Sequence, residues 1–116
     1  MTVKIYHNPR CSKSRETLTL LEQQYIPFEV ELYLQQTYSV EELQTLAQKL
    51  GIKSVREMMR CKDDLYLQLG LNNPDLTEQQ LLTALSQNSA LLERPIVVNG
   101  DKARIGRPPE NVLAIL

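Results

Sequence analysis

The fold of this chain is decided by its opening segment, residues 3–15, which reads VKIYHNPRCSKSR. Residues 3–6 begin it with a short apolar run that is typical of a buried strand. After a polar loop, Leu18 and Leu21 recur at helical spacing, so a helix is expected from residue 12 to about residue 24. The segment therefore predicts a strand, a loop and a helix, with Cys11 immediately before the helix.

The pattern after this opening predicts a second strand and then a change of character. Pro27 ends the first helix, and residues 28–34 alternate apolar and polar side chains, which indicates a strand parallel to the first through a helical crossover. Capping-box patterns at Ser39 and Thr77 mark helix starts, and Gly51 marks a helix end. Four helices are expected in the middle of the chain, at 39–50, 54–60, 63–69 and 77–88.

The last part of the chain returns to a strand pattern. Asn99-Gly100 separates the apolar segment 96–98 from a second segment at 102–105, and this dipeptide is a strong signal for a β-hairpin. A final helix is expected from about Pro108 to Leu116. The predicted order is β-α-β, a helical insert, and β-β-α.

Composition limits the classes of function. A chain of 116 residues is expected to form one domain without disulfides or metals. Its 13 Lys and Arg residues against 14 Asp and Glu residues give no basic field of the kind that general nucleic-acid binders carry. Two widely spaced cysteines, no signal stretch and no apolar span predict a cytoplasmic protein that does not enter a membrane.

Cys11 is the strongest candidate for a nucleophile. It lies at the expected start of a helix, with Arg10, Lys13 and Arg15 close in sequence, and such surroundings lower a thiol pKa. A small buried hydrophobic residue is the common alternative for a single cysteine, but the neighbouring charges disfavour it. Cys61 has no partner at C-x-x-C spacing and is interpreted as structural, with a resolving thiol as the less favoured alternative.

Three arginines, Arg60, Arg94 and Arg107, are candidates for binding an oxyanion. Guanidinium groups bind phosphate-like anions with several planar donors, and the helix start at Cys11 would add backbone N–H groups. Arg56 and Arg104 are interpreted as solvated charges. With one histidine in the chain, no metal site is expected.

Four segments of the chain resemble the glutaredoxin-linked arsenate reductases of the thioredoxin-like superfamily, in particular their YfgD-type branch. The segments, in the family's order, are His7-Asn8-Pro9-Arg10-Cys11 with Ser14-Arg15, Arg60 before Lys62-Asp63-Asp64-Leu65-Tyr66, Glu93-Arg94-Pro95-Ile96-Val97, and Gly106-Arg107-Pro108-Pro109-Glu110. The resemblance implies an α/β fold with a thioredoxin-like core, and a single domain over residues 1–116 with a helical insert at about 38–90.

The resemblance also implies an oxidoreductase activity and a role for each matched residue. The Cys11 thiolate would attack arsenate to form a covalent adduct, glutathione would act as co-substrate, and glutaredoxin would resolve the mixed disulfide, with no bound cofactor. The implied roles are nucleophile for Cys11, thiolate support for His7, Ser14 and Arg15, oxyanion binding for Arg60, Arg94 and Arg107, and a cis-proline beside the thiol for Pro95. The protein is expected to act as a monomer.

Two alternatives remain open at this point. Spx-type regulators share the implied fold and bind RNA polymerase, but their redox C-x-x-C pattern has Ser14 in place of the second cysteine here. The chain also carries Ser12-Lys13 where the arsenate-reducing members typically carry Gly-Thr, which leaves room for an oxyanion-binding protein of the same fold without reductase activity.

Overall fold

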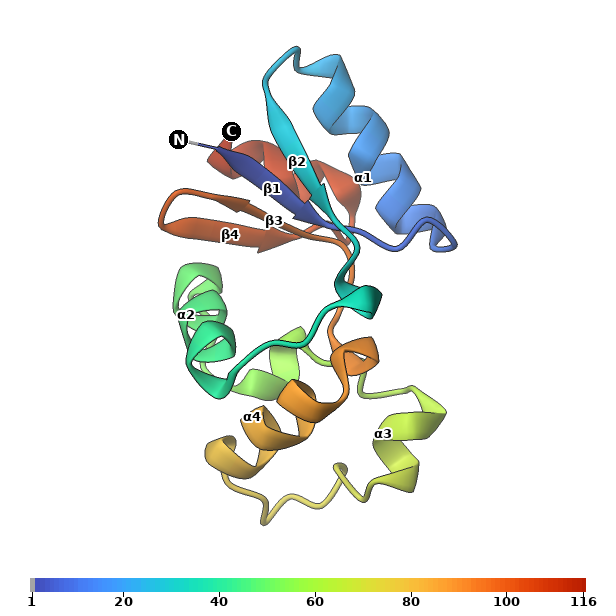
Figure 1. Ribbon diagram of the computed structural model, residues 1–116, viewed down its shortest axis with the longest axis vertical. Helices are drawn as coiled ribbons and strands as arrows, with labels where there is room; N and C mark the ends of the chain where they lie inside the picture. The colour runs from blue at the N-terminus through green and yellow to red at the C-terminus, as the bar shows by residue number, and fades with distance from the viewer. Residues whose placement is uncertain (1) are drawn as a thin grey trace.

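A computed structural model describes residues 2–116 as a four-stranded sheet with helices on both faces (Figure 1). The strands and longer helices are β1 (Val3–Tyr6), α1 (Ser12–Gln23), β2 (Phe28–Glu31), α2 (Val40–Leu50), α3 (Asp64–Gln68), α4 (Glu78–Gln87), β3 (Ile96–Asn99) and β4 (Lys102–Ile105). The 3-10 helices are η1 (Tyr33–Gln35), η2 (Val55–Met58), η3 (Ser89–Leu91) and η4 (Pro109–Ile115). This arrangement is the predicted thioredoxin-like fold, with α2, α3 and α4 between β2 and β3 in the chain.

The order of strands in the sheet is β2-β1-β3-β4. β1 pairs parallel with β2, as the helical crossover predicted, and antiparallel with β3, which forms the predicted hairpin with β4. In this register Tyr6 lies opposite Ile96, and Ile96 lies opposite Ile105. The C-terminal end of β1, the N-terminal end of β3 and the C-terminal end of β4 therefore lie side by side at one end of the sheet.

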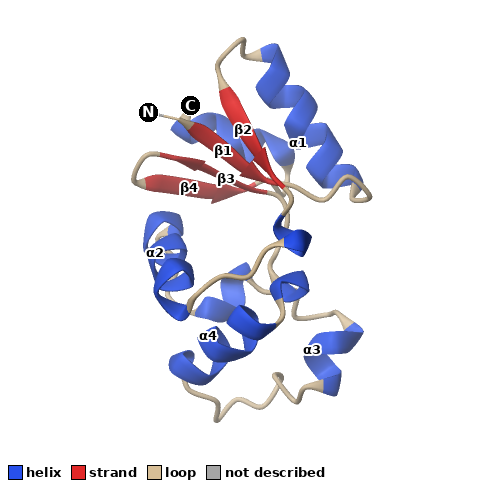
Figure 2. Cartoon of the chain, viewed as in Figure 1, coloured by secondary structure: helices blue, strands red, loops and turns tan. Residues whose placement is uncertain are grey.

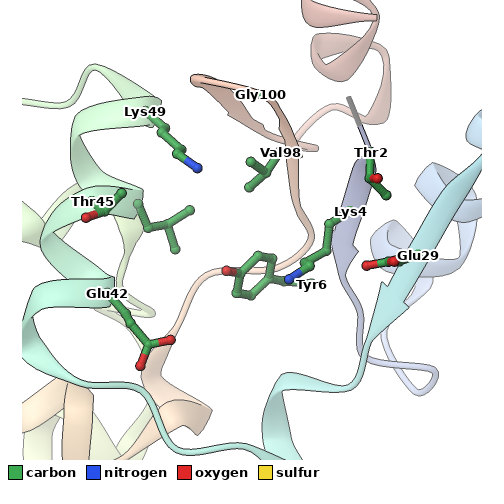
Figure 3. A pocket seen from close by; sticks show the side chains of 10 residues that line it. Thr2, Lys4, Tyr6, Glu29, Glu42, Thr45, Lys49, Val98 and Gly100 are labelled. Carbon is green, nitrogen blue, oxygen red and sulfur yellow. The ribbon is translucent and has the colours of Figure 1, made fainter.

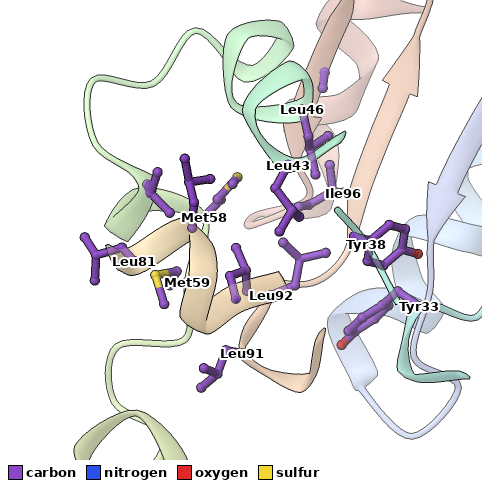
Figure 4. Packing of buried hydrophobic residues seen from close by; sticks show 14 of the residues in the cluster. Tyr33, Tyr38, Leu43, Leu46, Met58, Met59, Leu81, Leu91, Leu92 and Ile96 are labelled. Atoms are coloured by element: carbon purple, nitrogen blue, oxygen red, sulfur yellow. The ribbon is translucent and has the colours of Figure 1, made fainter. Parts of the chain in front are cut away.

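Separate apolar clusters cover the two faces of the sheet. One cluster joins α1 and η4 to the sheet, with Ile5, Leu21, Val97 and Val112 fully buried. The other joins the opposite face to α2 and α4, and Figure 4 shows the side chains of its α2, η2 and η3 parts packed together. The Leu-rich segment predicted as helix core lies inside this second cluster, and its members are buried: Leu81, Leu82, Leu85, Leu91 and Leu92.

The predicted helix caps are confirmed. The Ser39 hydroxyl accepts from the Glu42 N–H and the Glu42 carboxylate accepts from the Ser39 N–H, which is the complete capping box. Thr77 and Gln80 do the same at the start of α4. Gly51 ends α2 with a left-handed φ of 68°.

Three predicted elements differ from the structure. β2 ends at Glu31 rather than continuing to residue 34, because its partner β1 ends at Tyr6 opposite that residue. The segment 54–60 forms only the short 3-10 helix η2, since Met59 leaves the helix to bridge Leu92. Figure 2 shows the predicted helix near the C-terminus in blue, and this helix, η4, is of the 3-10 type.

Arg56 corrects a further expectation, because it is a structural residue rather than a solvated charge. Its Nη1 donates to the Tyr66 hydroxyl and the Leu71 carbonyl, and its Nη2 donates to the Asn73 carbonyl at 2.7 Å. A guanidinium group can satisfy several acceptors of one turn, which a sequence pattern does not reveal. Arg104 donates to the Ala103 carbonyl at 2.8 Å.

Within residues 2–116, no helix has the length and apolar character needed to span a membrane.

Candidate active site

The candidate site forms at the end of the sheet where β1 and β4 finish and β3 begins. The loop after β1 leads to Cys11, Arg94 directly precedes β3, and Arg107 follows β4. A second pairing brings Arg60 to the same place, because the Arg60 N–H donates to the Leu91 carbonyl at 2.8 Å and the Glu93 N–H donates to the Met58 carbonyl at 2.8 Å. Four separate segments of the sequence thus meet at one end of the sheet.

Cys11 is the N-cap residue of α1 and is 9% exposed. Its Sγ lies 3.6 Å from Nη2 of Arg107. Burial raises the pKa of the Cys11 thiol, but the backbone N–H groups of Ser14 and Lys13 and the charges of Arg94 and Arg107 together lower the pKa below its usual value. The Cys11 side chain makes no capping hydrogen bond to α1, but the start of the helix and the two arginines favour the thiolate.

The cations adjacent to Cys11 in sequence lie elsewhere. Arg10 is exposed. The Lys13 ammonium group pairs with Glu16 at 3.4 Å, and Nη1 of Arg15 donates to the Pro9 carbonyl at 2.9 Å. Arg94 and Arg107, far along the chain, are instead the arginines that lower the pKa of the Cys11 thiol.

His7 and Ser14 form a buried polar pair beneath the loop. Nδ1 of His7 and Oγ of Ser14 are joined by a 2.6 Å hydrogen bond, and the same Oγ accepts from the Asn8 N–H at 3.0 Å. Burial lowers the pKa of His7, and the Arg15 guanidinium lowers it further. The pair therefore reaches Cys11 through the backbone of Ser14 rather than by direct contact with the sulfur.

The three candidate arginines line one hollow of about 630 Å³. Arg60 pairs with Asp63 at 2.9 Å, and Nε of Arg107 lies 3.3 Å from Glu93 and donates to the Arg94 carbonyl at 2.8 Å. Nε of Arg94 is buried without a hydrogen-bond partner among residues 2–116. A buried donor without a partner costs free energy, and a bound anion would supply its acceptor.

The backbone beside these arginines is closely packed. The Arg94–Pro95 and Arg107–Pro108 peptide bonds are both cis. The Gly106 N–H donates to the Pro95 carbonyl at 2.9 Å, and a side chain at Gly106 would meet Thr17 Oγ1 at 2.6 Å. Pro95 is therefore fixed against the segment that carries Arg107 and against α1.

Two residues of this region, Tyr33 and Glu93, have no role that the sequence pattern predicts. The alternation of residues 28–34 predicts Tyr33 in a strand, but it lies in η1 and is 1% exposed. Burial raises the pKa of Tyr33, while the charges of Arg94 and Arg60 oppose the rise. Glu93 contacts two of the three arginines, and its position beside Arg94 in sequence is a signal that could have revealed it.

Cys61 lines the same hollow and is exposed. Its Sγ donates to the Arg56 carbonyl at 3.3 Å. Both cysteines are free thiols.

A second hollow, of about 380 Å³, lies between the sheet and α2 (Figure 3). Lys4, Lys49, Glu29 and Glu42 line it, so its charges are mixed, and it contains no thiol. Within the described part of the chain, no group of three His, Cys, Asp or Glu side chains could hold a metal ion. Cys11 does not line the hollow of about 630 Å³ itself but adjoins it through Arg107, which lines the hollow and has its Nη2 at 3.6 Å from the Cys11 Sγ.

The fold, with a thiol of lowered pKa at a helix start beside two arginines, defines the class of this protein as thioredoxin-like. The ArsC family model matches residues 6–115, and the chain belongs to the ArsC family. It is 65% identical to a protein of Haemophilus influenzae named arsenate reductase, over the full length of both chains. It is 54% identical to Escherichia coli YfgD, over 98% of this chain and 96% of that protein.

The solved structures agree with this membership. An arsenate reductase from Vibrio cholerae matches with a TM-score of 0.96 at 55% identity, covering 100% of this chain and 98% of that one. A putative arsenate reductase from Yersinia pestis matches with a TM-score of 0.93 at 58% identity, covering 97% of this chain and 99% of that one.

Proposed function

We propose that this protein is a cytoplasmic, monomeric arsenate reductase that takes its electrons from glutathione and glutaredoxin. The observation that carries the proposal is the buried Cys11 thiol, with a lowered pKa, at 3.6 Å from Nη2 of Arg107. Relatives named arsenate reductase at 65% and 54% identity support it. The single domain expected over residues 1–116 is part of the same proposal.

Binding would place arsenate in the hollow beside Cys11. Arg60, Arg94 and Arg107 line that hollow and can donate to three or more oxygens of a tetrahedral anion. The buried Nε of Arg94 gains an acceptor when the anion enters. Partial desolvation strengthens each of these charge-assisted hydrogen bonds.

The first chemical step would be attack of the Cys11 thiolate on arsenic. An S–As bond forms and an As–O bond breaks, and the departing oxygen takes up protons and leaves as water. The arginines would stabilise the negative charge that collects on the remaining oxygens. His7 and Ser14 would act as positioning residues, because their hydrogen bond fixes the loop and the Ser14 N–H beside the sulfur.

Reduction would follow when a glutathione thiolate attacks Sγ of Cys11. An S–S bond forms, the S–As bond breaks, and its electron pair passes to arsenic, so As(V) becomes As(III) and leaves as arsenite. A glutaredoxin thiolate then attacks the glutathione sulfur of the mixed disulfide and releases the Cys11 thiolate. Each turnover is thus balanced by the two electrons that the thiols supply.

The test is arsenite production from arsenate with glutathione, glutaredoxin and an NADPH-coupled glutathione reductase. Cys11→Ser should abolish turnover, and Cys61→Ser should retain it. Full turnover by Cys11→Ser would refute the nucleophile, and background turnover by the wild-type protein would refute arsenate as the substrate.

A further inference from the structure

Glu93 is a carboxylate inside a site that otherwise gathers positive charge. Its Oε1 lies 3.3 Å from Nε of Arg107 and 3.9 Å from Nη1 of Arg94, and it accepts from the Arg94 N–H at 3.2 Å. The side chain is 24% exposed and lines the hollow with the three arginines. An anion that enters the hollow must therefore meet a negative group as well as positive ones.

All the polar contacts of this carboxylate use one oxygen. Within residues 2–116, the hydrogen bonds and ion pairs of Glu93 are made by Oε1, and Oε2 takes part in none. An ionised carboxylate can only accept hydrogen bonds, so Oε2 offers an acceptor and needs a donor. The two arginine side chains near Glu93 approach Oε1, at 3.3 and 3.9 Å, so Oε2 is the oxygen left open to a donor of a molecule bound in the hollow.

Tetrahedral oxyanions differ in whether they can supply this donor. Arsenate and phosphate keep at least one proton at neutral pH, whereas sulfate keeps none. A protonated oxygen would donate to Oε2, but an unprotonated one would face it with like charge and leave its lone pairs unsatisfied. Sites built to hydrogen-bond a hydroxyl reject analogues that lack one far more strongly than apolar pockets reject a missing methylene group.

We propose that Glu93 is a specificity-determining residue whose Oε2 accepts a hydrogen bond from a protonated oxygen of the bound oxyanion, so that the site selects arsenate-like and phosphate-like anions over sulfate-like ones. The proposal rests on the proposed oxyanion chemistry of the same hollow. The arginines supply affinity for any tetrahedral anion, and Glu93 distinguishes one anion from another by its proton.

The test compares the binding of inorganic phosphate and inorganic sulfate by titration calorimetry at pH 7.5, with the reduced wild-type protein and Glu93→Gln. Glutamine keeps the size of the side chain but removes its charge and adds a donor. We expect the preference for phosphate over sulfate to fall by about tenfold or more, the worth of one hydrogen bond to a charged group. Glu22→Gln removes the same charge from the exposed face of α1 and should leave the preference unchanged.

The outcomes separate the role of Glu93 from the function of the site. If Glu93→Gln weakens both anions equally, Glu93 only positions the arginines and the proposal is overturned. A wild-type protein that reduces arsenate but binds phosphate and sulfate alike overturns it too, and leaves the reductase standing. A wild-type protein that neither binds nor reduces any of these anions overturns both. Should Glu93→Gln fail to fold, Glu93→Ala removes the acceptor altogether and must lose the preference for phosphate over sulfate.

Discussion

The reactivity of Cys11 should depend on an arginine that is distant in sequence rather than on the one beside it. Nη2 of Arg107 lies 3.6 Å from Sγ, and two unit charges at that distance attract by about 1 kcal/mol in a water-like dielectric. Solvent screens this pair because the Arg107 side chain is 37% exposed, and the water-like value is the smallest attraction expected for a sulfur that is 9% exposed. About 1 kcal/mol corresponds to roughly fivefold in the thiolate population.

Arg107→Ala should therefore slow the alkylation of Cys11 by iodoacetamide by about fivefold at a pH below the thiol pKa, where the rate follows the thiolate fraction. The assay needs a Cys61→Ser background, since Cys61 is exposed and would also react. Arg10→Ala is the matched control, because Arg10 adjoins Cys11 in sequence, is exposed and is not among the groups that shift its pKa.

The result that would refute this reasoning is an equal slowing by Arg10→Ala and Arg107→Ala, which would mean that the local cluster of charges sets the reactivity. An unchanged rate in Arg107→Ala would likewise show that the 3.6 Å contact does not stabilise the thiolate. Melting temperatures of both variants establish that the fold is intact.

Three further predictions concern the fold and its pH dependence. Leu85→Ala should reduce the free energy of unfolding by about 2–5 kcal/mol in urea denaturation, because Leu85 is 1% exposed in the larger core cluster; a loss below about 1 kcal/mol would show that the site collapses around the cavity. Gly106→Ala should lower both stability and Cys11 reactivity, since the new Cβ would meet Thr17 Oγ1 at 2.6 Å and Pro95 Cγ at 2.8 Å; an unaffected melting temperature would contradict the close packing. Burial lowers the pKa of His7 below 6.5, so the stability contributed by its neutral ring is complete above pH 6.5 and is lost as the pH falls through the folded-state pKa. His7→Gln should flatten this part of the curve of unfolding free energy against pH, and an unchanged slope there would exclude His7 as its source.

The sequence predicted best those features that depend on neighbouring residues. The capping box at Ser39 and the hairpin turn at Asn99-Gly100 are each decided within a few positions, and both are confirmed. The parallel pairing of β1 with β2 was also predicted, because a helical crossover allows few other arrangements.

The features that escaped prediction depend on which segments meet in space. The alternation through Tyr33 is typical of a strand, but pairing stops where β1 ends, and Tyr33 lies instead in η1, buried in the larger core cluster. The sequence pattern predicts that the cations adjacent to Cys11 lower its pKa. The register of the strands instead brings Arg94 and Arg107 near Cys11, and their charges lower the pKa. Arg56 escaped for the same reason, since its acceptors come from a turn more than ten positions away.

The contact between Cys11 and Arg107 joins residues 96 positions apart in a chain of 116. A growing chain that has been synthesised only as far as α4 already contains the whole of α1 but neither Arg94 nor Arg107. Such a chain holds the residues of the helix start but not the two arginine charges that lower the pKa of the Cys11 thiol, nor the strands β3 and β4 that carry them to it. The full electrostatic surroundings of the nucleophile therefore need both ends of the chain.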